Sequence, residues 1–177
     1  MAGAKTLVVY YSRTGTTRKV AQLMAAALGA ELDEIRETTS RSGVLGYLRA
    51  CYDAVTKRSA PILTGKKNPG NYDLVVIGTP VWASAMPPPV RTYLTTAKGQ
   101  LPAVAFFCTL GGSGAEATIK QMAAVAGKAP SATCAIAAHV VARGLAGASV
   151  SDFVKRLVPP ATPAKANFRM FPDPAHA

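Results

Sequence analysis

The chain has 177 residues, which is enough for one domain of ordinary size and too few for two. Hydrophobic residues make up 49% of the sequence and charged residues 16%, and this composition excludes the disordered and fibrous classes. Twenty Lys and Arg against nine Asp and Glu give a net charge of +11, which predicts a negatively charged partner: nucleic acid, an anionic membrane or a phosphorylated ligand.

The first part of the chain predicts a strand, a helix and a second strand. Residues 6–11 are a continuous apolar run that is typical of a buried strand, and a polar loop follows them. Apolar residues at helical spacing predict a helix over residues 20–28, with Gly29 where the helix ends. Residues 30–36 predict a shorter and more exposed strand, and residues 44–55 again have helical spacing.

The rest of the chain repeats this alternation three times after a loop at residues 60–71. Strands are predicted at residues 73–80, 103–108 and 133–140. Helices are predicted at residues 87–94, where a triple proline opens the helix, and at residues 115–126 and 150–158. Such alternation predicts an α/β fold of three layers, a doubly wound five-stranded parallel sheet with helices on both faces. We expect this domain to span residues 1–158 and residues 159–177 to form a Pro- and Ala-rich tail.

Three of the predicted strands end in loops that suit ligand binding. In an open parallel sheet, ligands bind outside the carboxyl ends of the strands. The loops are loop 1, with Ser12, Arg13, Thr14, Gly15, Thr16 and Thr17; loop 2, with Thr79, Pro80, Val81, Trp82, Ala83 and Ser84; and loop 3, with Thr109, Leu110, Gly111, Gly112, Ser113 and Gly114.

Loop 1 has the features of a phosphate site. It offers four hydroxyl groups and a glycine that lets backbone N–H groups converge, and the positive end of a helix dipole follows it. It matches neither the Walker A motif nor the G-x-G-x-x-G dinucleotide motif. We expect Arg13 to contact the phosphate, whereas Arg18 and Lys19 have two open interpretations, phosphate contact or exposure to water.

Loops 2 and 3 suit a flat ring. Trp82 is the only tryptophan of the chain; a lone tryptophan is more often a core residue, but its place in a polar, proline-flanked loop favours a ligand contact. Loop 3 is small and rich in glycine, which allows the backbone to approach a ring closely.

In this order the three loops resemble those of the flavodoxin family, and the resemblance covers about residues 5–158. It implies the strand order 2-1-3-4-5 and noncovalently bound FMN. Residues 12–17 would then hold the phosphate of FMN, and residues 79–84 and 109–114 would lie on the two sides of its ring.

The sequence also departs from the electron carriers of that family. Those proteins are typically acidic, and their third loop usually supplies an aromatic side chain that loop 3 lacks. An open ring face favours an FMN-dependent oxidoreductase with a two-electron cycle, with NAD(P)H or a quinone as partner. Two interpretations stay open for Tyr47, Tyr52, Phe168 and Phe171: they cover that face, or they belong to the core or to a dimer contact, which is the favoured interpretation for Tyr47 and Tyr52. A non-enzymatic electron carrier that docks an acidic redox protein is the alternative function, and a scaffold domain without cofactor is the third.

Other classes of function are disfavoured. The basic residues are spread along the chain without a nucleic-acid-binding motif, and no apolar run is long enough to span a membrane. Three widely spaced cysteines indicate reduced thiols and a cytoplasmic protein. His139, expected within a strand, and His176 lie far from the loops in sequence, and no catalytic triad, carboxylate pair or metal-ligand spacing is present. Whether the protein forms a homodimer stays an open question.

Overall fold

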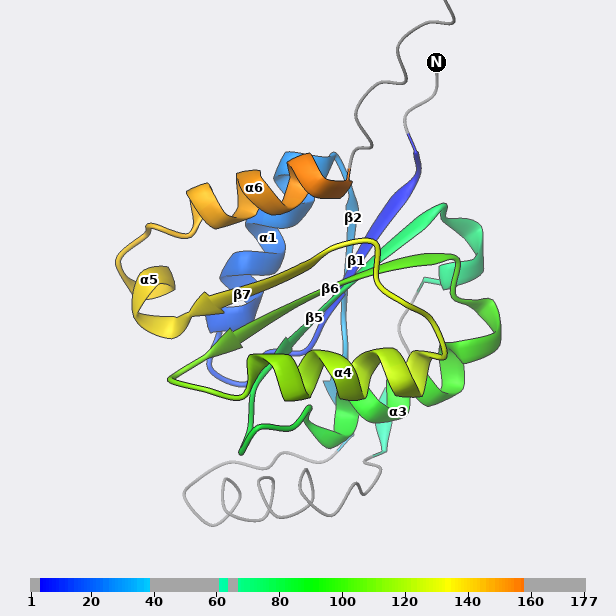
Figure 1. Ribbon diagram of the computed structural model, residues 1–177. Coiled ribbons are helices and arrows are strands. Elements are labelled where there is room, and N and C mark those ends of the chain that lie inside the picture. Colours follow the sequence, from blue (N-terminus) through cyan, green and yellow to red (C-terminus); the bar gives the residue numbers. More distant parts are fainter. Residues whose placement is uncertain (1–3, 39–60, 64–66, 158–177) are drawn as a thin grey trace, which may run out of the picture.

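A five-stranded parallel sheet forms the centre of the computed structural model, which describes residues 4–38, 61–63 and 67–157 (Figure 1). Its strands are β1 (Thr6–Tyr10), β2 (Glu31–Glu34), β5 (Leu74–Pro80), β6 (Ala103–Leu110) and β7 (Thr133–Ala137). Their order in the sheet is β2-β1-β5-β6-β7, and every neighbouring pair is parallel. The predicted fold class and the order 2-1-3-4-5 are therefore confirmed.

Helices cover both faces of this sheet (Figure 1). One face carries α1 (Thr16–Leu28), α5 (Ala138–Ala142) and α6 (Gly147–Leu157), and the other carries α3 (Pro88–Ala97) and α4 (Ala115–Ala126). Two short 3₁₀ helices, η1 (Pro69–Asn71) and η2 (Lys98–Gln100), precede β5 and β6. None of the described helices is long and apolar enough to cross a membrane.

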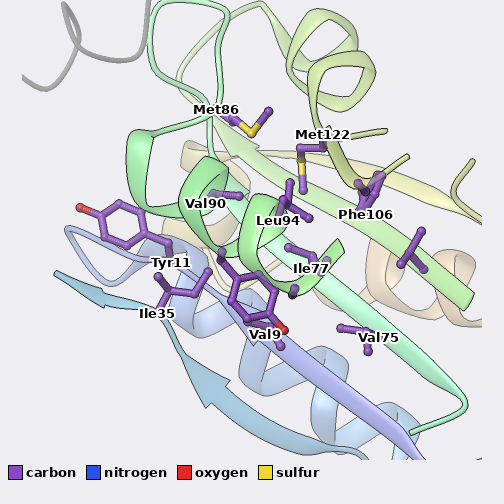
Figure 2. Packing of buried hydrophobic residues seen from close by; sticks show 14 of the residues in the cluster. Val9, Tyr11, Ile35, Val75, Ile77, Met86, Val90, Leu94, Phe106 and Met122 are labelled. Atoms are coloured by element: carbon purple, nitrogen blue, oxygen red, sulfur yellow. The ribbon is translucent and has the colours of Figure 1, made fainter. Parts of the chain in front are cut away.

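Helices cover both faces of the sheet, and successive side chains of a strand point to opposite faces, so each strand contributes side chains to two buried clusters. In β1, Leu7 and Val9 pack into the cluster under α3 and α4, whereas Val8 and Tyr10 pack into the cluster under α1 and α6. Figure 2 shows the first of these clusters, in which side chains of α3 and α4 meet those of the central strands. This two-sided burial explains why the central strands are continuous apolar runs in the sequence.

The end of the fifth strand differs from the prediction. The predicted strand at residues 133–140 is three residues too long, because β7 ends at Ala137 and α5 begins at Ala138. Ala137 pairs with Leu110, the last residue of β6, so the chain beyond it has no neighbouring strand to pair with. His139 therefore lies in a short helix and is exposed, not within a strand.

The single exposed strand predicted at residues 30–36 is also wrong in part. After β2 the backbone N–H of Ile35 donates to Tyr10 O, and a separate two-stranded antiparallel sheet then pairs β3 (Arg36–Glu37) with β4 (Ile62–Leu63). β4 falls in a segment predicted to be a loop. The helix predicted at residues 44–55, with Tyr47, Cys51 and Tyr52, and the tail at 159–177, with Phe168, Phe171 and His176, lie outside the described residues.

Candidate functional site

A pocket of about 210 Å³ lies at the carboxyl edge of the sheet. All three predicted loops contribute to its walls, because the parallel strands β1, β5 and β6 end at the same edge. The lining residues that the sequence predicted are Arg13, Thr14, Thr16, Thr17, Pro80, Val81, Trp82, Thr109, Leu110 and Gly111.

Eight predicted site residues belong to the same loops but do not line this pocket. They are Ser12, Gly15, Thr79, Ala83, Ser84, Gly112, Ser113 and Gly114. Some of them make contacts that shape the loops: Ser12 Oγ accepts a hydrogen bond from Gly15 N at 3.1 Å, and Thr79 Oγ1 donates to Pro80 O at 3.0 Å.

One lining residue was missed by the sequence analysis. Ala138 joins the pocket wall as the first residue of α5. The end of β7 lies at the same edge of the sheet as the three loops, so the residue that follows this strand could have been predicted to line the pocket. The predicted strand runs to residue 140, however, and therefore includes Ala138.

Loop 1 leads into a helix N-terminus whose N–H groups are available to an anion. Helix α1 begins at Thr16, and no side chain caps its N-terminus. The backbone N–H of Lys19 donates to Gly15 O, so the N–H groups of the first turn before it have no acceptor within the helix. Since Thr16 and Thr17 line the pocket, this positive end of the helix lies at the pocket wall.

A buried pair of hydroxyls connects loop 1 to loop 3. The Oγ1 atoms of Thr17 and Thr109 lie 2.8 Å apart, and their side chains are 1% and 4% exposed. Backbone bonding adds a second link at this edge, because Val81 N donates to Thr109 O at 2.8 Å. Thr109 thus contacts both of the other loops.

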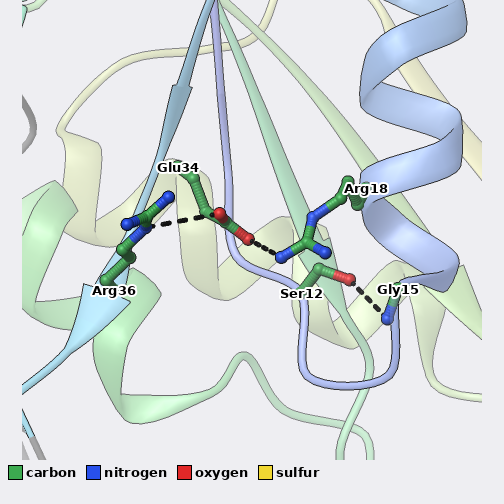
Figure 3. Close-up of polar contacts among 5 residues, drawn as sticks. All are labelled: Ser12, Gly15, Arg18, Glu34 and Arg36. Atoms are coloured by element: carbon green, nitrogen blue, oxygen red, sulfur yellow. Dashed lines mark hydrogen bonds and ion pairs between the residues drawn. The ribbon is translucent and has the colours of Figure 1, made fainter.

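The cations near loop 1 divide into two groups. Arg18 donates to Glu34 Oε1 at 2.5 Å, and Arg36 lies 3.4 Å from the other oxygen of the same carboxylate (Figure 3). The hydrogen bond to Glu34 raises the pKa of the Arg18 guanidinium above its usual range. Arg18 is therefore an ion-pair partner of β2 and does not line the pocket, whereas Arg13 lines it. Lys19 is exposed and does not line it either.

Trp82 is at once a core residue and a pocket wall. It is 7% exposed and packs in the cluster under α3 and α4, where its ring meets that of Tyr11 edge to face at 5.7 Å. The guanidinium of Arg13 lies over the same ring, 6.0 Å from its centroid. Trp82 therefore has the burial of a core residue and also lies in the wall of the pocket.

The polypeptide around the pocket offers little acid, base or nucleophilic chemistry. Among the described residues that line it, Arg13 is the one charged side chain. Cys108, one residue before Thr109, is fully buried, and burial raises the pKa of its thiol to about 12. Within the part of the chain that the structure describes, no three His, Cys, Asp or Glu side chains are grouped to hold a metal ion.

Comparison with known proteins identifies the relatives of this fold. A family model described as flavodoxin matches residues 5–157. A flavoprotein from Lactobacillus acidophilus, solved in complex with FMN, is 25% identical, with 79% of this chain and 97% of that chain covered and a TM-score of 0.64. The solution structure of the apo form of a flavoprotein from Lactobacillus acidophilus is 27% identical, covering 77% and 93% with a TM-score of 0.58.

A third structure is similar in fold alone. A flavoprotein from Bacteroides uniformis is 22% identical, with 86% of this chain and 99% of that chain covered and a TM-score of 0.70. No curated protein matches the sequence.

Proposed function

The chain belongs to the flavodoxin family, and from this premise we propose that the pocket at the carboxyl edge of the sheet binds FMN noncovalently. The observation that carries the proposal is the convergence of loops 1, 2 and 3 on one pocket, with the uncapped N-terminus of α1 in its wall. The similar flavoprotein from Lactobacillus acidophilus was solved with FMN, which supports the same cofactor here. We assign the FMN-binding domain to residues 1–158 and the tail to residues 159–177.

The phosphate of FMN fits loop 1. A dianion gains most from donors that are already in place, and the first-turn N–H groups of α1 and the hydroxyls of Thr14 and Thr16 are such donors. The two hydroxyl oxygens lie 3.4 Å apart, so they can donate to the same anion. Arg13 of the same loop adds a positive charge to the pocket lining.

The ring of FMN fits between loops 2 and 3. Trp82, Val81 and Leu110 give the pocket apolar walls on either side. The glycines of loop 3 leave room, because a Cβ atom added at Gly111 or at Gly112 would meet no atom within 4 Å. Residues 109–114 include no aromatic side chain to stack on the flavin, so we expect the ring face on the side of loop 3 to stay accessible to a second reactant beyond the contact with Leu110.

This open face favours an oxidoreductase that works by a two-electron cycle. Bound FMN supplies hydride or electron transfer, and the protein supplies position and charge. We assign NAD(P)H as the donor and a quinone as the acceptor, and we place the protein in the cytoplasm. The net charge of +11 supports a negatively charged reactant such as NAD(P)H.

A non-enzymatic electron carrier is the second candidate. The same net charge of +11 would dock an acidic redox protein through complementary surfaces, and loop 3 is exposed at Gly111, Gly112 and Ser113 for such a contact. In this function the ring edge would exchange single electrons with the partner and no small substrate would bind.

Absorbance of the full-length protein tests these proposals in order. A flavin spectrum after incubation with FMN and gel filtration is expected, and a protein that stays colourless would reject both redox functions. NAD(P)H should then bleach the flavin, and a quinone should restore its colour with turnover. Stepwise reduction with dithionite should show one spectral transition for the oxidoreductase. Two well-separated transitions without NAD(P)H turnover would instead support the electron carrier.

A further inference from the structure

Loop 2 contains a tight turn whose backbone conformation is unfavourable for its residues. Trp82 and Ala85 exchange two backbone hydrogen bonds of 2.9 Å, and the two residues between them, Ala83 and Ser84, have φ angles of +48° and +58°. Such turns usually place Gly, Asn or Asp at these positions, because a Cβ atom makes the left-handed region costly. A turn built from Ala and Ser therefore depends on neighbours that hold it.

One side chain outside the pocket holds this turn. Gln121 of α4 donates from Nε2 to Ser84 O at 3.3 Å, and its Oε1 accepts from Nη2 of Arg91 in α3 at 3.3 Å. A guanidinium can only donate and a carbonyl oxygen can only accept, so the amide of Gln121 has one orientation that satisfies both. The contact with Arg91 thus orients the amide so that its NH₂ group faces Ser84 O of the turn.

The start of α4 lies directly against the same turn. A Cβ atom added at Gly114, whose φ is +96°, would lie 2.6 Å from both Cα and Oγ of Ser84. Such contacts require a glycine at this position, so the backbone of loop 3 supports loop 2 without an intervening side chain. The turn is held from one side by Gly114 and from another by Gln121.

We propose that Gln121, oriented by Arg91, is a positioning residue that holds residues 82–85 in the left-handed turn and so fixes Trp82 in the pocket wall. Neither Gln121 nor Arg91 lines the pocket, and both act through Ser84. The predicted effect of Gln121 on FMN affinity rests on the proposed function. The predicted effect of Gln121 on the conformation of Trp82 holds whether or not the pocket binds FMN.

The substitution Gln121→Glu keeps the hydrogen bond with Arg91 and removes the one with Ser84. A glutamate still accepts from Arg91, but it presents an acceptor to Ser84 O and repels it. Gln121→Met removes both bonds without adding charge. Because Trp82 is the only tryptophan and is buried, its fluorescence reports on the turn without any ligand. Both variants should show red-shifted emission and stronger quenching by acrylamide.

Ala83→Gly is the test of the turn itself. Glycine adopts positive φ without the cost of a Cβ atom, so this substitution should return the emission of the Gln121 variants toward that of the unmodified protein. Lys120→Gln is the matched control, because it removes one positive charge beside Gln121 at an exposed position that pairs with Glu116. It should leave the emission unchanged.

Affinity gives the second measurement. Gln121→Met, which adds no charge, should weaken the binding of FMN and of riboflavin by similar factors, about threefold to tenfold, because the lost contact acts on the ring side of the pocket. Unchanged Trp82 emission and quenching in both Gln121 variants would overturn the proposal, and so would failure of Ala83→Gly to restore them. A protein that binds no flavin would reject the proposed function, while the fluorescence measurement would still decide the role of Gln121.

Discussion

Thr17 and Thr109 are 92 positions apart in sequence, yet their hydroxyl oxygens lie 2.8 Å from each other. The pair joins the first turn of α1 to the end of β6, and both side chains are buried. One bond thus connects the loop with features of a phosphate site to the loop on the opposite side of the pocket.

The substitution Thr17→Val should show how much this hydrogen bond contributes to the free energy of unfolding. Valine keeps the shape of threonine but leaves the buried hydroxyl of Thr109 without its partner, and this typically costs about 1 to 3 kcal/mol of unfolding free energy. Urea unfolding measures the loss. Adding Thr109→Val should recover part of it, since two apolar side chains then meet. Thr95→Val is the control, because its hydroxyl is exposed and bonds only its own helix at Arg91 O. Equal costs at Thr17 and Thr95 would contradict the prediction.

Gly78→Ala tests the packing beneath the pocket. A Cβ atom on Gly78 would lie 2.0 Å from Cζ of Phe107 on the neighbouring strand, and both residues are buried in the centre of the sheet. Overpacking of this kind costs about 1 to 3 kcal/mol or more. The midpoint of urea unfolding should fall accordingly, whereas Gly99→Ala, where the added carbon meets nothing within 4 Å, should leave it nearly unchanged.

The role of Phe107 in that cost can be checked in a second background. In a Phe107→Leu variant the ring is gone, so Gly78→Ala should cost less there than in the unmodified chain. The same cost in both backgrounds would mean that backbone conformation, and not the ring, excludes a side chain at Gly78.

Much of the fold could be predicted because its signals are local. The central strands are buried on both faces, so they are continuous apolar runs, and α4 has its predicted bounds because its apolar spacing, the glycine before it and the glycine after it are adjacent in sequence. The three loops follow from those strand ends, and within the described part of the chain they account for every lining residue except Ala138.

What could not be predicted depends on partners far apart in the sequence. The predicted strand at 133–140 ends at Ala137, which pairs with Leu110 at the end of β6. The two-residue strands β3 and β4 have no pattern of their own and exist as a pair. The sequence leaves two interpretations for Arg18, because its ion-pair partner Glu34 lies 16 residues away on β2. The contact of Gln121 with Ser84 spans 37 positions and leaves no trace in either local sequence.

The two arginines near loop 1 should differ in their effect on FMN. Arg13 lines the pocket, whereas Arg18 pairs with Glu34 on β2. Arg13→Gln should therefore lower FMN affinity roughly tenfold, as expected for a hydrogen bond to a charged group, and Arg18→Gln should change it by less than about twofold.

Riboflavin separates a phosphate contact of Arg13 from its contact with Trp82. Riboflavin lacks the phosphate, so Arg13→Gln should leave its affinity nearly unchanged if the guanidinium acts on the phosphate. Titration of flavin fluorescence measures both ligands. An equal loss for FMN and riboflavin would assign Arg13 to the ring through Trp82, and a large loss in Arg18→Gln would contradict the placement of Arg18 away from the pocket.

The buried thiol of Cys108 should be inert in the native protein until the pH is strongly alkaline. Burial raises its pKa from 9.0 to about 12, and only the thiolate reacts with iodoacetamide. At pH 8.5, peptide mapping by mass spectrometry should find Cys108 unmodified in the folded protein and modified in urea. The same shift predicts that stability falls as pH rises from about 9 to about 12, because the unfolded chain then releases a proton that the folded chain keeps. Cys108→Ala should flatten that fall in the urea midpoint. A native modification rate equal to that in urea would show that Cys108 is accessible.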